Sequence, residues 1–205
     1  MPHARALKAL EDLKAGNARF IAGAGRVAAA ISADHRAELV AGQSPHAIVL
    51  GCSDSRVPAE IVFDQGLGAL FVIRVAGNIV APTQVASVEF AAARFGTRLV
   101  VVLGHSSCGA VAATLEAIQN DTAADTRNLQ SIVDRIRPTI VGLTRTPLAR
   151  DAEALMSEAV RANVRASANH LRHGSELLER LGREDGLLVV GAEYDLETGG
   201  VEFLA

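Results

Sequence analysis

The chain has 205 residues, of which 49% are apolar, and this is enough to bury the core of a single domain. Its formal net charge of −3 offers no basic surface for nucleic acid, so we expect no nucleic-acid partner. No stretch reaches the roughly 18 continuous apolar residues that a membrane span needs, and the charged segment 1–20 does not resemble a secretory signal, so we expect a cytoplasmic protein with reduced cysteines.

The first elements predicted along the chain are helices. Apolar residues recur at helical spacing over residues 4–22, and the glycines at 23–25 are expected to end this helix. A second, short helix is expected from an N-cap at Ser32 to Gly42. We therefore describe residues 1–42 as an N-terminal helical arm.

Short apolar runs alternate with helical segments in the next part of the chain. The runs at 47–51, 70–73 and 99–103 are continuously apolar, as strands buried on both faces are, and residues 83–95 have helical character. This order favours parallel βαβ units with right-handed crossovers. They would form a core of residues 43–118 that carries the functional site.

Helices and terminal strands are predicted for residues 119–205. The helices are expected at 129–140 and 149–173, with Gly174 as a stop and Ser175 as a new N-cap. Strands are expected at 187–190 and 200–204, joined by a hairpin turn. The predicted fold class is α/β, in one domain. Its sheet has about four parallel strands and an antiparallel C-terminal edge strand, flanked by helices.

Both cysteines of the chain lie in two short motifs. Cys52-Ser-Asp-Ser-Arg56 follows the first predicted strand, and His105-Ser-Ser-Cys108 follows the third. Parallel strands end at one edge of a sheet, so Cys52, His105 and Cys108 should converge there. Two thiols and an imidazole suit Zn²⁺, and three protein ligands leave a fourth position open, as in catalytic zinc sites. A disulfide between the cysteines is the weaker alternative.

The third ligand, Cys108, is expected in the first turn of the following helix. The positive N-terminus of a helix favours a thiolate over a thiol, and only the thiolate binds metal.

Asp54 and Arg56 need separate roles, because a purely structural zinc site does not need them. An aspartate beside zinc can either ligate the metal or accept a hydrogen bond from a zinc-bound hydroxide. A guanidinium within reach would hold the carboxylate bidentately and away from the metal. The alternative is a surface ion pair of little energetic consequence. Their position beside the predicted metal site favours the catalytic role.

Six short motifs are distributed over nearly the whole chain. They are Gly16-Asn-Ala-Arg-Phe20, Gly51-Cys-Ser-Asp-Ser-Arg-Val-Pro58, Phe63-Asp-Gln-Gly-Leu-Gly68, Arg74-Val-Ala-Gly-Asn78, Gly104-His-Ser-Ser-Cys-Gly109 and Gly191-Ala-Glu-Tyr-Asp195. Together they make the sequence similar to the β-class carbonic anhydrases of bacterial type. The resemblance implies one Zn²⁺ per subunit, held by the two cysteines and the histidine. It implies Asp54 and Arg56 as a catalytic dyad, with Asp54 as a fourth ligand in a closed state.

The same resemblance implies a substrate pocket and a partner subunit. Gln43 would hydrogen-bond a substrate oxygen across a dimer, and the backbone N–H of Gly109 would bind a second oxygen. Phe71 and Phe90 would form an apolar wall, and Ala76 stands where plant members carry valine. The assembly would be a homodimer or a dimer of dimers, with active sites at the subunit interface. The N-terminal helix would lie across the partner.

The implied reaction is the reversible hydration of carbon dioxide to bicarbonate and a proton, by attack of zinc-bound hydroxide. Two alternatives remain at this point. One is hydrolysis of carbonyl sulfide or carbon disulfide on the same scaffold, because a fold does not determine a reaction. The other is a noncatalytic, zinc-stabilised binding protein, which would not need the Asp54–Arg56 pair.

Overall fold

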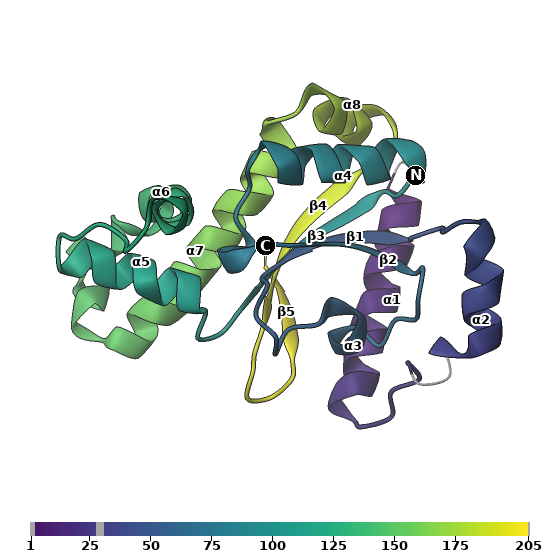
Figure 1. Ribbon diagram of the computed structural model, residues 1–205, viewed down its shortest axis with the longest axis horizontal. Helices are drawn as coiled ribbons and strands as arrows, with labels where there is room; N and C mark the ends of the chain where they lie inside the picture. Colours follow the sequence, from purple (N-terminus) through teal and green to yellow (C-terminus); the bar gives the residue numbers. More distant parts are fainter. Residues whose placement is uncertain (1–2, 28–30, 205) are drawn as a thin grey trace.

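A five-stranded sheet forms the centre of the molecule (Figure 1), in the order β2-β1-β3-β4-β5. The computed structural model describes residues 3–27 and 31–204. The strands are β1 (Ala47–Gly51), β2 (Leu70–Arg74), β3 (Leu99–His105), β4 (Leu188–Tyr194) and β5 (Val201–Leu204). Strands β1 to β4 run parallel and β5 pairs antiparallel with β4, which confirms the predicted fold class.

Helices cover both faces of the sheet. The α-helices of the described residues are α1 (Ala4–Ile21), α2 (Ala33–Glu38), α3 (Ala59–Val62), α4 (Pro82–Arg94), α5 (Gly109–Gln119), α6 (Arg127–Ile140), α7 (Ala152–His173) and α8 (Glu176–Glu184). Helices α1 and α3 pack on one face, and α4, α7 and α8 pack on the other. Every residue of β1 and β3 is therefore buried. Within the described ranges, no helix is both long and apolar enough to cross a membrane.

Helix α1 packs on the sheet of its own subunit. Leu13 on its inner face is completely excluded from solvent, within the cluster that contains the strand residues Val49 and Val101. The sequence led us to expect an extended helix that lies across a partner. In the single chain the apolar face of α1 is buried on its own sheet, and the contact of this helix with a partner stays a prediction. The outer face, with exposed Leu7 and Ile21, is the part left for a partner to contact.

The boundaries of several elements differ from those predicted. Strand β3 continues to His105 and β4 continues to Tyr194, because the two residues pair with each other at the end of the parallel ladder. His105 is thus the last residue of its strand and does not lie beyond it. Helix α7 begins at residue 152, three residues later than predicted, where the Asp151 carboxylate accepts from the backbone N–H groups of residues 153 and 154.

Candidate active site and metal centre

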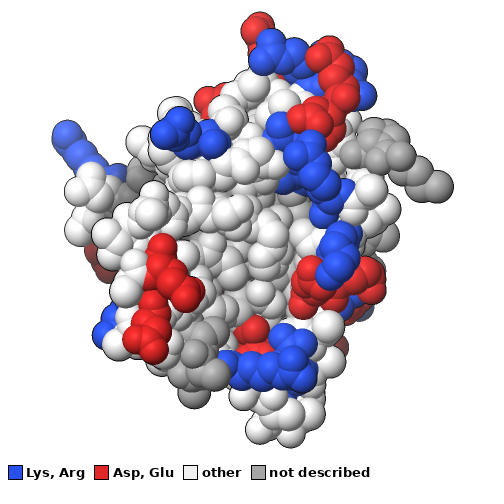
Figure 2. Space-filling model, turned by 90° about the vertical axis from the view of Figure 1, so that its right-hand side faces the viewer, with Lys and Arg blue, Asp and Glu red and all other residues white. Residues whose placement is uncertain are grey.

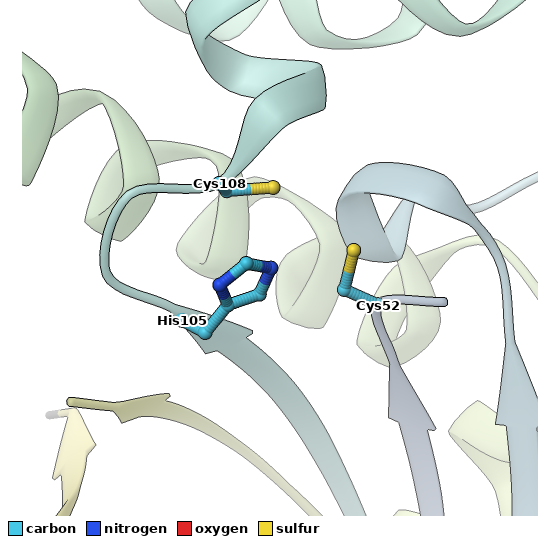
Figure 3. Close-up of side chains that lie close together, drawn as sticks. All are labelled: Cys52, His105 and Cys108. Carbon is cyan, nitrogen blue, oxygen red and sulfur yellow. The ribbon is translucent and has the colours of Figure 1, made fainter. Parts of the chain in front are cut away.

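The two cysteines and His105 come together at the carboxyl ends of β1 and β3 (Figure 3). Cys52 follows β1 directly, His105 ends β3, and Cys108 is the N-cap of α5, one residue earlier than the predicted first helical turn. Their potential ligand atoms all lie within 4.8 Å of one another, and all three residues are buried. Both cysteines are free, so the disulfide alternative is not realised.

The orientation of the His105 ring suits a metal ligand. Its Nδ1 lies 2.9 Å from the carbonyl oxygen of Ser106, which can only accept, so Nδ1 carries the proton. Its Nε2 is buried and has no hydrogen-bond partner among the described residues. A buried nitrogen in this state is unfavourable unless something binds it. The arrangement of two thiols around an unprotonated nitrogen therefore fits a metal ion of the zinc type.

The loop between His105 and Cys108 is anchored on the neighbouring strand. The Ser106 backbone N–H donates to the carbonyl of Tyr194 at 2.9 Å, and its hydroxyl accepts from the N–H of Leu196 at 2.9 Å. Ser107 adopts a φ of 56°, a left-handed conformation that turns the chain from β3 into α5. The carbonyl that orients the imidazole is thus fixed by β4 and the turn that follows it.

The two thiols differ in their pKa. A hydrogen bond from Cys108 lowers the pKa of Cys52 to about 4, and the backbone N–H of Gly77 donates to the same sulfur. The same hydrogen bond, together with burial, raises the pKa of Cys108. Without metal, the pair therefore holds one thiolate and one thiol. Metal binding must displace the remaining proton.

Asp54 and Arg56 form a bidentate ion pair beside the thiols. Nε and Nη2 of the guanidinium lie 2.9 and 2.7 Å from the two carboxylate oxygens. These hydrogen bonds hold the pKa of Asp54 well below its usual range. One carboxylate oxygen lies 3.9 Å from Nε2 of His105. The carboxylate is therefore ionised, held by Arg56, and within reach of a group bound at the metal site.

Arg74 holds the loop that carries these residues, a role that the sequence analysis did not identify. Its Nε donates to the carbonyl of Cys52 at 3.1 Å, and its Nη2 donates to the carbonyl of Asp54 at 2.6 Å. Arg74 ends β2, opposite Gly51 of β1. The only sequence signal for it was its place in the motif 74–78, since the contact depends on strand register.

The substrate-pocket residues implied by the resemblance do not all meet at the metal site within one chain. Gly109 does lie there, as the first residue of α5, and Ala76 follows the end of β2. Phe71 pairs with Ile48, about 13 Å back along the strand from the end that carries the thiols. Gln43 is exposed and precedes the start of β1, whereas Cys52 follows its end.

Phe71 and Phe90 instead contact each other at the edge of the sheet. Their ring centroids are 6.1 Å apart, and both rings also contact Phe95. Phe90 remains 54% exposed in the single chain. These rings could line a substrate pocket only at the metal site of a second chain.

Comparison with known proteins identifies relatives along nearly the whole chain. A family model described as carbonic anhydrase matches residues 47–201. Carbonic anhydrase 2 of Mycobacterium tuberculosis is 40% identical over 199 residues, which cover 97% of this chain and 93% of that protein. The carbonic anhydrase of Mycolicibacterium smegmatis is 37% identical over 202 residues, which cover 98% of this chain and 95% of that protein.

Solved structures show the same architecture. A β-carbonic anhydrase of the fungal pathogen Aspergillus fumigatus matches with a TM-score of 0.74 at 26% identity, over 83% of this chain and 80% of that one. A tetrameric β-carbonic anhydrase from the ascomycete Sordaria macrospora also matches with a TM-score of 0.74 at 26% identity, over 83% of this chain and 85% of that one. With its Cys-His-Cys site inside the matched region, the chain belongs to the β-carbonic anhydrase family, and its reaction is the hydration of carbon dioxide.

Proposed function

We propose that this carbonic anhydrase is a zinc enzyme, in which Cys52, His105 and Cys108 hold the metal. The observation that carries the proposal is the buried, unpartnered Nε2 of His105 between two free thiols. This donor set suits Zn²⁺ and leaves a fourth coordination position open. A zinc ion there would supply a Lewis acid that makes water a nucleophile near neutral pH.

Asp54 and Arg56 then act on the reacting groups. The ionised Asp54 would accept a hydrogen bond from the attacking oxygen. This hydrogen bond would direct a lone pair of the same oxygen toward the carbon of carbon dioxide. Arg56 keeps the carboxylate ionised and in place by its two hydrogen bonds. The N–H of Gly109, at the start of α5, belongs to the unpaired donors of a helix N-terminus, and is available to a substrate oxygen.

A homodimer, alone or paired into a dimer of dimers, would complete the substrate pocket. Strand β2 lies at the edge of the sheet, where no strand of residues 3–27 or 31–204 pairs with its outer backbone groups. Figure 2 shows the side of the molecule on which β2 and α2 lie, with a broad uncharged area ringed by charged residues. The tetrameric assembly of the Sordaria macrospora relatives is consistent with such a contact. A second chain on this face would bring its Gln43, Phe71 and Phe90 toward the first metal site.

The test of this proposal measures metal content and carbon dioxide hydration in the same preparation. We expect about one zinc ion per chain and rapid hydration in stopped flow, both lost in His105→Ala. His173→Ala, which removes an exposed histidine, is the matched control and should keep both. Faster turnover of carbonyl sulfide than of carbon dioxide would contradict the assigned substrate. Full hydration activity without bound metal would contradict the zinc site.

Location in the cell is a separate part of the proposal. We place the enzyme in the cytoplasm, where its two free cysteines would stay reduced. Recovery of the protein in the periplasmic or culture-medium fraction of its cells would contradict this.

A further inference from the structure

A buried asparagine on α7 reaches the residue that hydrogen-bonds the Cys52 sulfur. Nδ2 of Asn163 donates to the carbonyl of Gly77 at 2.8 Å, and the N–H of Gly77 donates to Sγ of Cys52 at 3.3 Å. Asn163 is 2% exposed. Asparagine is a weak helix former, so its place inside a 22-residue helix needs a compensating contact.

Gly77 can link Asn163 to Cys52 because its backbone is closely packed between Ile136 and Ala110. Its φ of 71° lies in the left-handed region, and a Cβ at this position would lie 2.8 Å from Ile136 Cδ1 and 3.0 Å from Ala110 Cβ. Its N–H and C=O belong to adjacent peptide planes that meet at one Cα, so a restraint on the carbonyl restricts the N–H as long as the left-handed conformation of Gly77 is kept. A hydrogen bond to a thiolate is charge-assisted and depends on that direction.

Helix α7 also contacts the other strand that carries a ligand. A Cβ on Gly104, the residue before His105, would lie 2.3 Å from Val164 Cγ2. Asn163 and Val164 are neighbours on α7, so one helix supports both the β3 end and the Gly77 turn. Helix α7 thus supports both the Gly77 N–H that donates to Cys52 and the end of the strand that carries the His105 imidazole.

We propose that Asn163 is a positioning residue of the metal site, which sets the hydrogen bond from Gly77 to the Cys52 sulfur. This inference rests on the proposed zinc site. Loss of the amide would leave the Gly77 carbonyl without its donor and free the turn to rotate. The Cys52 thiolate would then donate more electron density to the metal, and the ligand would be held less firmly.

The test uses the full-length protein loaded with cobalt in place of zinc. In Asn163→Leu, which keeps most of the volume without a donor, the thiolate-to-cobalt charge-transfer band should move to longer wavelength. Zinc affinity, measured by competition with a chromophoric chelator, should fall about 10–100-fold. Asn17→Leu is the matched control, because Asn17 is a buried amide on α1 that donates to the carbonyls of Val62 in α3 and Gly199 in the turn between β4 and β5. It should lower stability without moving the band.

Each outcome of this test separates the inference from the proposed function. A wild-type protein that binds neither metal would overturn the zinc site itself. Normal metal binding with an unshifted band in Asn163→Leu would overturn the role of Asn163 alone, even if the melting temperature falls. If Asn163→Leu does not fold, Asn163→Ala removes the same donor with a smaller side chain and is measured in the same two ways.

Discussion

Arg56 holds both carboxylate oxygens of Asp54, through Nε at 2.9 Å and Nη2 at 2.7 Å, and its backbone N–H donates to the same carboxylate at 2.9 Å. The carboxylate therefore faces the guanidinium, although one of its oxygens lies only 3.9 Å from Nε2 of His105. If zinc binds as proposed, Arg56 would be the group that keeps Asp54 from turning toward the metal. In that proposal, the pair would decide whether the fourth metal position is open.

Replacement of Arg56 should favour the closed state. In Arg56→Ala the Asp54 carboxylate loses its two side-chain hydrogen bonds and becomes free to ligate the metal, so we expect kcat/KM to fall about 10–100-fold while zinc content stays unchanged. Stopped-flow hydration and metal analysis on the same sample measure both. Arg56→Lys should give an intermediate rate, because an ammonium keeps the charge but not the bidentate geometry. Full turnover in Arg56→Ala would rule out the role of the pair.

Zinc affinity should increase with pH. The pKa of Cys52 is lowered to about 4, so this thiol is ionised at neutral pH, whereas the raised pKa of Cys108 keeps its proton on in the metal-free site. Zinc must displace that proton, so the apparent affinity should rise about tenfold per pH unit. Chelator competition between about pH 7 and 9 measures this slope.

The slope should become steeper below the raised pKa of His105. Burial lowers the pKa of His105, but the negative charges of Cys52 and Asp54 and the contact with the Ser106 carbonyl outweigh it and raise the pKa overall. Below this raised pKa, zinc must displace a second proton, from the imidazole. A zinc affinity that does not change with pH would show that neither Cys108 nor His105 carries a proton that zinc must displace.

Gly77→Ala should destabilise the fold more than an alanine at another left-handed glycine. Gly96 has a φ of 67°, and a Cβ added there would meet no atom within 4 Å, so Gly96→Ala introduces only backbone strain of about 1–2 kcal/mol. Gly77→Ala adds the contacts with Ile136 and Ala110, for about 1–3 kcal/mol more. Urea unfolding of the metal-free proteins compares the two. An equal loss of unfolding free energy in the two variants would mean that the turn around Gly77 shifts enough to accommodate the new methyl group without further destabilisation.

The convergence of Cys52, His105 and Cys108 could be predicted because their residue types and their places in the chain are both local features. A cysteine directly after a continuously apolar run and a histidine at the end of another must meet at one sheet edge if the strands are parallel. The lengths of β3 and β4 could not be predicted in the same way. Glu193 and Tyr194 do not resemble a buried strand, and they extend β4 because Gly104 and His105 pair with them.

Other parts of the site depend on contacts between distant segments. Asn163 lies 86 residues from the Gly77 carbonyl it binds, and no spacing in the sequence connects the two. Arg74 reaches the Cys52 loop through the register of β2 against β1. Gln43, Phe71 and Phe90 would reach a metal site only in the proposed dimer, from a second chain. Residue type and local periodicity contain none of this information.

A charge at the edge of the sheet should weaken subunit association and activity together. Phe90 on α4 is 54% exposed in the single chain and contacts Phe71 of the edge strand, so Phe90→Glu would place a carboxylate in the apolar contact. Leu129→Glu is the matched control. Leu129 is 37% exposed on α6, on the side of the molecule away from β2 (Figure 1).

Sedimentation equilibrium and stopped-flow hydration, over a range of protein concentrations, measure the two effects. Phe90→Glu should raise the dimer dissociation constant at least about tenfold, and its specific activity should rise with protein concentration as dimers form. Leu129→Glu should leave both unchanged. A monomeric Phe90→Glu protein with full activity would show that each chain completes its own substrate pocket, and would remove Gln43 and Phe71 of a second chain from the site.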